Sequence, residues 1–260
     1  MEMHGGPGGV LHGKTALVTG ASRGIGRGIA QRLAASGAIV AVHYATNAQA
    51  AQEVVSSLQA KGGQAFAIQA DLVMPGAIEK VVGELEAELT RRTGEAGLDI
   101  LVNNAGGGSY AGVQDTSEDF FDRTFKLNAR APFFLTQALL PRLRKGGSVI
   151  NISSEAARIH LVQTVAYSMA KSALEDFTVC LAKEIGPRGV RVNAVRPGVI
   201  HTAQSDDYLS IPEKRKEIEE GTALRRIGHT DDMAEFVHAL ITAAGFVTGQ
   251  VIEVSGGYLL

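Results

Sequence analysis

Residues 15–26 read TALVTGASRGIG, an apolar run followed by a glycine-rich turn. The first five, Thr15–Thr19, are apolar or β-branched, as in a buried strand. Three glycines follow, Gly20, Gly24 and Gly26, and a helical stretch, Gly26–Ser36, begins at the last of them. Glycines at such a turn bring backbone amides close to a pyrophosphate, and the start of the helix adds partial positive charge. The stretch therefore predicts a dinucleotide-binding turn, with a tight turn that binds nothing as the alternative.

The alternation of strand and helix continues along the chain. Helical stretches separate the apolar runs, for example at Ala48–Lys61, Ala77–Thr93 and Ala166–Ile185. The runs are apolar almost throughout, which is typical of parallel strands buried on both faces. We predict one α/β domain, a doubly wound Rossmann-type parallel seven-stranded sheet with helices on both faces. After Thr15–Thr19, its strands are expected at Ile39–His43, Ala65–Gln69, Ile100–Asn103, Ser148–Ser153, Arg191–Arg196 and Gln250–Ser255.

Two segments depart from this alternation. Residues 1–12, MEMHGGPGGVLH, are rich in glycine and are predicted to form a flexible tail, so that the domain spans residues 13–260. Residues 199–223 contain no strand-like run, and long insertions of this kind often close over a site. We predict a substrate lid there, with Ser210 capping a helix and Glu213 three residues on.

Composition excludes several classes of function. The net charge of −2 provides no basic face for nucleic acid. The single cysteine, Cys180, excludes an intrachain disulfide and a multi-cysteine metal site, and it is expected in the core. We predict a cytoplasmic protein with neither a membrane span nor a signal peptide. The histidines show no ligand spacing, so no metal site is predicted.

The second strand bears on the choice of cofactor. An NAD site usually has a carboxylate at the end of this strand, where it holds the ribose 2′-hydroxyl. Here that end reads AVHYAT, residues 41–46, with Tyr44 and no carboxylate. Ser22 and Arg23, in the glycine turn, offer a hydroxyl and a guanidinium to a 2′-phosphate. The sequence thus predicts NADPH/NADP+.

A second cluster carries acid–base chemistry. Tyr167 and Lys171 are four residues apart, so both side chains lie on one face of a helix. A tyrosine hydroxyl can protonate a developing alkoxide if a nearby ammonium lowers its pKa from about 10. Ser154 ends the fifth strand, and its hydroxyl can bind the substrate oxygen, with Ser153 as the competitor.

These motifs resemble the short-chain dehydrogenase/reductase family, most closely beta-ketoacyl-acyl carrier protein reductases and polyketide-type ketoreductases. The resemblance extends from Gly13 to Gly257 and selects Ser154 by its thirteen-residue spacing to Tyr167. It implies a fourth catalytic residue, Asn128, whose alternative role is to satisfy backbone groups at a helix kink. It also implies cofactor contacts from Gly20, Ser22, Arg23, Gly24, Ile25, Gly26, Tyr44, Asp71, Leu72, Asn104, Ala105, Gly106, Tyr167, Lys171, Pro197, Gly198, Ile200 and Thr202. For Asp71, capping the next helix is the alternative.

The expected function is NADPH-dependent reduction of a ketone to a secondary alcohol. Ser154 would position the carbonyl, Tyr167 would donate the proton, and Lys171 would lower the pKa of Tyr167 and hold the ribose. The substrate would be a keto-acyl thioester or a polyketide-like ketone. Two alternatives stay open: an alcohol or sugar dehydrogenase using NAD(P)+ in the oxidative direction, and a non-catalytic cofactor-binding sensor.

The resemblance also points to partners. A homotetramer with paired helices is implied, since the helices around Phe133 and within Ala166–Ile185 are apolar on more than one face. Lys145 and Arg188 are candidates for docking an acyl carrier protein that delivers the substrate. Further candidates for lining the pocket are Tyr110, Glu155, Thr164, Tyr208 and Leu209.

Overall fold

A computed structural model describes residues 9–108, 111–159 and 161–260. Within these ranges seven parallel strands form one sheet in the order β3-β2-β1-β4-β5-β6-β7. The predicted sheet is confirmed. Its strands are β1 (Thr15–Val18), β2 (Ile39–Tyr44), β3 (Gln64–Gln69), β4 (Leu98–Asn103), β5 (Leu143–Ile152), β6 (Arg191–Pro197) and β7 (Val251–Val254).

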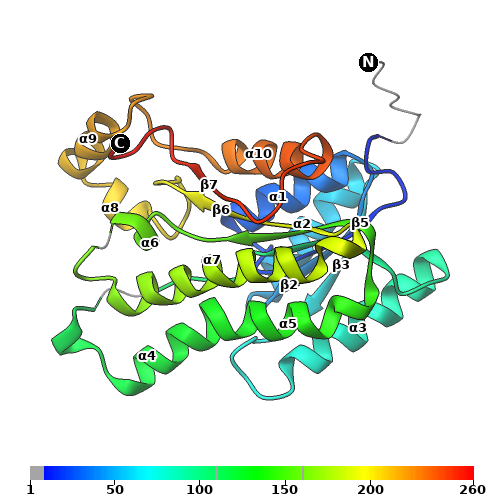
Figure 1. The fold of residues 1–260 in the computed structure, drawn as a ribbon. Coiled ribbons are helices and arrows are strands. Elements are labelled where there is room, and N and C mark those ends of the chain that lie inside the picture. Colours follow the sequence, from blue (N-terminus) through cyan, green and yellow to red (C-terminus); the bar gives the residue numbers. More distant parts are fainter. Residues whose placement is uncertain (1–8, 109–110, 160) are drawn as a thin grey trace.

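Helices cover both faces of this sheet (Figure 1). On one face lie α1 (Gly24–Ala35), α2 (Ala48–Ala60) and α10 (Thr230–Thr242). On the other lie α3 (Ala77–Thr93), α5 (Ala131–Leu139) and α7 (Val165–Ile185). Shorter helices are α4 (Glu118–Phe125), α6 (Ala156–Ile159), α8 (Asp206–Leu209) and α9 (Pro212–Gly221).

Two apolar layers follow from the alternation of side chains along β1. Val18 packs with Ile29 and Leu33 of α1, whereas Leu17 points to the opposite face and joins the layer of α3, α5 and α7. All three of these aliphatic side chains on the α1 side are fully buried. Because both faces of the strand are covered, its sequence is apolar at nearly every position.

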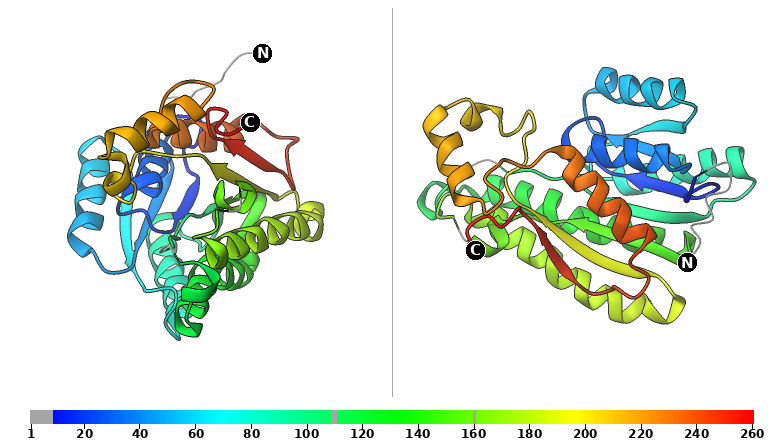
Figure 2. Two further views of the ribbon diagram at one scale, coloured as in Figure 1. Left: turned by 90° about the vertical axis from the view of Figure 1, so that its left-hand side faces the viewer. Right: turned by 90° about the horizontal axis from the view of Figure 1, so that it is seen from above.

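The order of the strands reverses between β1 and β4, which are neighbours in the sheet. In doubly wound sheets, ligands bind beyond the carboxyl ends of the strands at this switch point. Figures 1 and 2 show α6, α8 and α9 gathered at one end of the molecule together with the C terminus. The fold thus brings the glycine turn, the lid segment and the ends of β4, β5 and β6 to the same edge.

Three local expectations need correction. Residues 9–12 of the expected tail are described, and Leu11 is buried, with its amide donating to the Ser36 carbonyl; residues 1–8 lie outside the described residues. Cys180 is exposed, because its face of α7 points away from the sheet. Ser210 does not cap α9: Ile211 holds the cap position, and the Ser210 hydroxyl donates to Asp207.

The strands also differ in extent and burial from the expectation. β5 begins at Leu143, five residues before Ser148, where polar residues had masked the strand pattern. At the edge of the sheet, all four residues of β7 are only half-buried. In the described ranges no helix combines the length and the hydropathy needed to cross a bilayer.

Candidate active site

The glycine turn between β1 and α1 is built for close backbone approach. Gly20 and Gly24 have φ of +62° and +56°, a region that favours glycine. A Cβ on Gly26 would lie 2.5 Å from the Gly20 carbonyl oxygen, so no larger residue fits there. Among the described residues, no side chain caps α1 and no acidic residue occupies its first turn. The amides and the positive end of this helix therefore suit an anionic ligand, and the cradle fits a pyrophosphate.

Side chains from neighbouring strands hold this turn. The Asn104 amide donates to the carbonyls of Thr19 and Gly20, at 2.8 and 3.2 Å. The Thr19 hydroxyl accepts the amides of Asn104 and Ala105, both at 2.9 Å. Asn104 thus braces the turn, while Gly106 stays exposed beyond it. These contacts explain why an asparagine follows β4.

His43 also supports the glycine turn, a role that the sequence did not predict. Its Nδ1 accepts the Gly20 amide at 3.2 Å, and its Nε2 lies 3.0 Å from the Ala70 carbonyl oxygen. Burial lowers the pKa of His43 to about 4, against weaker raising effects of Ala70 and Asp71. The neutral imidazole is therefore the form that holds the turn. No motif in the sequence indicates this role, because a histidine within a strand usually just packs in the core.

The residues expected to contact the adenosine part of the cofactor, and to favour NADPH over NADH, lie around this turn. Arg23 is exposed, Ser22 and Tyr44 are half-buried, and β2 ends without a carboxylate. Asp71 does not cap α3, whose cap is Gly76; its carboxylate accepts the Val73 amide and lies 3.9 Å from Arg123. The alternative role considered for Asp71 is therefore wrong. Leu72 beside it is buried.

The loop after β6 meets the glycine turn from the other side. A Cβ on Gly24 would lie 3.5 Å from Cγ2 of Thr202, so the two expected cofactor residues are neighbours. Ile200 is buried and pairs with Gly228, while Pro197 ends β6 and Gly198 packs against the backbone of Ser255. Ile25 packs against the core of the α1 face. The structure thus brings the turn after β1 and the loop after β6 together.

Tyr167, Lys171 and Asn128 surround a second glycine segment, residues 106–108. The position of a Cβ on Gly106 lies 2.9 Å from Asn128 Oδ1 and 3.0 Å from Lys171 Nζ. A Cβ on Gly108 would lie 2.9 Å from the Tyr167 ring. Lys171 Nζ is 5.7 Å from the centre of that ring. Three of the four predicted catalytic residues therefore face one backbone segment at the end of β4.

Lys171 is held as a buried cation. Its side chain is 3% exposed, and Nζ donates to the Ile152 carbonyl at 2.8 Å. Burial lowers the pKa of Lys171 to about 8, while the charge of Glu175 raises it. A buried ammonium close to a tyrosine ring favours the tyrosinate form and lowers the pKa of the hydroxyl.

Asn128 sits in a π-helical turn, residues 126–130, between α4 and α5. It is fully buried; its amide donates to the carbonyls of Gly107 and Thr124, and its oxygen accepts the Gly107 amide. Asn128 therefore satisfies backbone groups at a distorted helix, as the alternative role predicts. Its Oδ1 also faces the same point beside Gly106 as Lys171 Nζ does. π-turns are frequent at functional sites.

Ser154 and Ser153 have different surroundings. Ser153 is buried, and its hydroxyl donates to Glu175 at 2.6 Å. Ser154 is half-buried, and among the described residues its hydroxyl oxygen accepts only the Ala156 amide, at 3.2 Å. Ser154 therefore has a hydroxyl proton to offer, whereas that of Ser153 is engaged. This geometry agrees with the choice of Ser154.

Residues proposed to line the pocket or dock a carrier have mixed outcomes. Tyr110 lies outside the described residues. Thr164 is hydrogen-bonded to Ser168, and Leu209 is buried in α8. Lys145 and Arg188 lie at the amino ends of β5 and β6, opposite the site, and Arg188 donates to the Leu140 and Leu143 carbonyls. Docking of an acyl carrier protein by these two residues stays a prediction.

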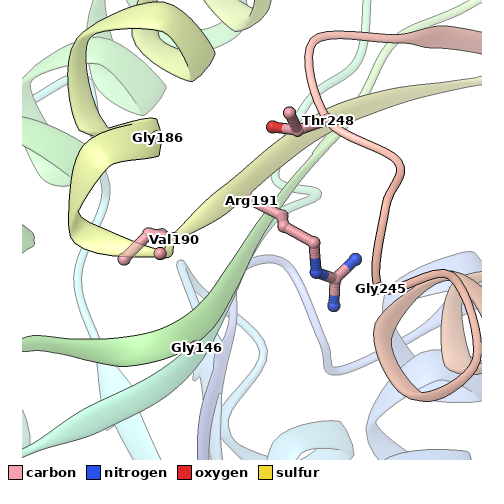
Figure 3. Close-up of a pocket in the computed structure, with 7 residues that line it drawn as sticks. Gly146, Gly186, Val190, Arg191, Gly245 and Thr248 are labelled. Carbon is pink, nitrogen blue, oxygen red and sulfur yellow. The ribbon is translucent and has the colours of Figure 1, made fainter.

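A hollow of about 430 Å³ lies at that same amino end, between Gly146, Gly186, Val190 and Gly245 (Figure 3). Its one charged side chain, Arg191, points toward α10 and donates to the carbonyls of Leu240, Ile241 and Ala244. The guanidinium thus satisfies the end of a helix. The one charged side chain that lines this hollow is thus already engaged in hydrogen bonds, so the candidate active site is the one at the carboxyl edge of the sheet.

Comparison with known proteins agrees with this site. The family described as enoyl-(acyl carrier protein) reductase matches residues 20–259. Versicolorin reductase stcU from Emericella nidulans is 38% identical over 95% of this chain and 96% of its own length. Hydroxynaphthalene reductase arp2 from Aspergillus fumigatus is 37% identical, over 92% of this chain and 90% of its own. The structure of the angucycline C-6 ketoreductase LanV with bound NADP superposes with a TM-score of 0.92, at 42% identity, covering 96% of this chain and 97% of that one.

Proposed function

This chain belongs to the short-chain dehydrogenase/reductase family of oxidoreductases, and we propose that it reduces a ketone on a polyketide-type aromatic skeleton to a secondary alcohol with NADPH. One observation carries the proposal. The buried ammonium of Lys171 lies 5.7 Å from the Tyr167 ring, on the glycine segment that follows the switch-point strand β4. A proton donor thus stands at the place where a doubly wound sheet binds its ligand.

The cofactor would be held by the chain's own backbone. The amides at the start of α1 would bind the pyrophosphate, and the Gly106 segment would let the nicotinamide ribose approach Lys171. When bound, the reduced nicotinamide supplies the hydride. Arg23 and Ser22 would bind a 2′-phosphate, which the missing carboxylate at the end of β2 does not repel. The relative LanV was crystallised with NADP, in agreement with this choice.

The residues of the chain would handle the proton. Ser154 donates a hydrogen bond to the carbonyl oxygen and orients it beside Tyr167. The hydroxyl of Tyr167 gives its proton to that oxygen as negative charge develops. Lys171 stabilises the resulting tyrosinate. Asn128 Oδ1 and Lys171 Nζ face the same point beside Gly106, so Asn128 would provide a polar route by which a proton returns to Tyr167. These roles assign the four predicted catalytic residues to one proton path.

The mouth of the site suits an apolar ring system. Exposed aliphatic side chains stand on the segments that flank it: Val113 after β4, Leu161 and Val162 before α7, and Leu224 after α9. The two flanks touch, since the Ala111 amide donates to the Gln163 carbonyl. Residues 199–223, with α8 and α9, would close over this mouth as a lid. The names of the reductases of versicolorin and hydroxynaphthalene indicate aromatic substrates of the same kind.

We further propose a cytoplasmic homotetramer. Phe133 and Phe134 of α5 and Met169 of α7 are each more than a third exposed. The ring of Phe177 on α7 packs against that of Phe133 at a tilt of 47°, with the ring centres 4.9 Å apart. Apolar side chains on two neighbouring helices favour burial against a second copy. A lone exposed cysteine agrees with a reducing compartment.

The test is NADPH consumption with two panels of ketones: polycyclic aromatic ketones, and linear keto-acyl thioesters. The proposal expects turnover with the aromatic panel, with NADPH binding at least about tenfold more tightly than NADH because of the 2′-phosphate contact. Turnover of the thioesters alone would overturn the substrate class. Oxidation of alcohols with NAD+ alone would favour the dehydrogenase alternative, and cofactor binding without any turnover would favour the sensor.

A further inference from the structure

A chain of alternating charges leads away from Lys171. Glu175 lies one turn farther along α7 and forms a two-point ion pair with Arg196 of β6, at 3.0 and 2.7 Å. Arg196 in turn lies 3.8 Å from Glu253 of β7, and Arg158 of α6 bridges Glu253 and Glu155 at 3.0 Å each. The side chains of Glu175 and Arg196 are 13% and 17% exposed. Such a paired, largely desolvated carboxylate is held in one place.

The same pair supports the strand end that carries Ser154. Glu175 accepts the hydroxyl of Ser153 at 2.6 Å, and the amide of Ser153 donates to the Val195 carbonyl at 2.7 Å. On the other side of Ser154, the amide of Glu155 donates to the Pro197 carbonyl. Ser154 is thus fixed between two residues that are tied to the segment of β6 around Arg196.

Building on the proposed function, we propose that Glu175 and Arg196 are a positioning pair for the reaction: Arg196 holds the Glu175 carboxylate, which anchors Ser153 and sets the charge that acts on Lys171 and Tyr167. Neither residue touches the reacting atoms. Their effect reaches the proton donor through the neighbouring Lys171 and through the strand end that bears Ser154.

The charges around Lys171 predict opposite effects for the two members of the pair. From α7 itself Glu175 acts on the ammonium and Tyr167 lies beside it; from β6 comes Arg196; and the π-turn contributes the uncharged Asn128. The carboxylate of Glu175 raises the pKa of Lys171. The guanidinium of Arg196, which donates to that carboxylate at 2.7 Å, carries the opposite charge and should offset part of this effect. Removing Glu175 therefore lowers the pKa of Lys171 and Tyr167, whereas removing Arg196 raises it.

The experiment titrates Tyr167 in the protein without cofactor. Tyrosinate absorbance in the near ultraviolet is recorded against pH, and the curve of Tyr167→Phe is subtracted to isolate this residue from the other four tyrosines. The variants are Glu175→Gln, Arg196→Gln and the double variant. The matched control is Arg144→Gln, which removes an arginine paired with Asp99 at the opposite end of β5.

We expect Glu175→Gln to lower the midpoint by about 0.5–1 pH unit, and Arg196→Gln to raise it by a similar amount. The double variant should fall between them, and Arg144→Gln should match the wild type. Where turnover is measurable, the alkaline limb of kcat/KM should move in the same two directions. If Arg196→Gln does not fold, Glu175→Asp against Glu175→Gln carries the test, since only the latter removes charge.

Shifts in the same direction, or none, would overturn the inference and leave the pair a structural ion pair. Because the titration needs neither cofactor nor substrate, its result is independent of whether the proposed ketone reduction is correct. A wild type that titrates as expected but reduces no ketone would refute the proposed function alone. A wild type that reduces ketones, with both variants titrating like it, would refute only the positioning pair.

Discussion

Replacing Gly26 with alanine should disable the cofactor cradle. The new Cβ would lie 2.5 Å from the Gly20 carbonyl oxygen and close to the Asn104 amide nitrogen. Real Cβ atoms stay at least 3.0 Å from such atoms, so the turn must open by at least 0.5 Å. The Gly20 carbonyl belongs to the backbone and cannot rotate away as a flexible side chain would, and the Asn104 amide is held by its two hydrogen bonds to the turn.

The magnitude follows from the contacts that are lost. Asn104 donates two hydrogen bonds to the turn, at 2.8 and 3.2 Å. Their loss costs about 1 kcal/mol each, and poorly paired carbonyls add about 2 kcal/mol. Helix propensity returns about 1 kcal/mol, because alanine replaces glycine within α1. We therefore expect Gly26→Ala to lower the free energy of unfolding by about 3 kcal/mol.

The assay pairs urea unfolding with NADPH binding by fluorescence. Gly83→Ala is the matched control: Gly83 also lies inside a helix, α3, and a Cβ there meets nothing within 4 Å. The control should gain about 0.5–1 kcal/mol and keep its affinity. Gly26→Ala should bind NADPH at least about tenfold more weakly. Wild-type stability and affinity in Gly26→Ala would show that the turn accommodates a Cβ and that the close approach at Gly26 is not required.

Three further predictions concern the same edge of the sheet. His43 is neutral in the fold with a pKa of about 4, below its ordinary 6.5, so its contribution is complete above pH 6.5 and is lost as the pH falls toward 4. Between pH 6.5 and 5 the free energy of unfolding should drop by about 2 kcal/mol more in the wild type than in His43→Gln, and equal slopes in urea unfolding would exclude this. Ser154→Ala should lower kcat by about 10²–10³ while Ser153→Ala stays within about tenfold, and the reverse ranking in steady-state kinetics would assign the role to Ser153. Arg23→Ala should weaken NADPH binding by about tenfold or more and leave NADH unchanged; equal losses for both cofactors in a titration would show that Arg23 does not read the 2′-phosphate.

Features written in short stretches of sequence could be predicted. The glycine turn at residues 20–26 and the helical pair Tyr167 and Lys171 depend on local spacing, and the structure brings them to one edge as expected. The strands were found because parallel strands are apolar along their length. β5 was underestimated because its first residues, LRKGG, are polar despite lying in the sheet.

Features that depend on contacts between distant parts of the chain could not be predicted from the sequence. The support of the glycine turn by His43 joins residues 23 positions apart, and the Glu175–Arg196 pair joins residues 21 apart. Nothing near either residue in the sequence indicates its partner. Cys180 was misplaced for a related reason: α7 is apolar on two faces, and only the packing shows which face the sheet covers.

Tyr167 is the proposed proton donor in an NADPH-dependent ketone reduction. The most direct test of this role compares the wild type with Tyr167→Phe, measuring the Kd for NADPH and then the consumption of NADPH with an aromatic ketone that the wild type reduces. We expect the Kd of Tyr167→Phe for NADPH to stay within about threefold of the wild type and its kcat to fall by about 10²–10⁴. Turnover by the variant at the wild-type rate would show that Tyr167 is not the proton donor.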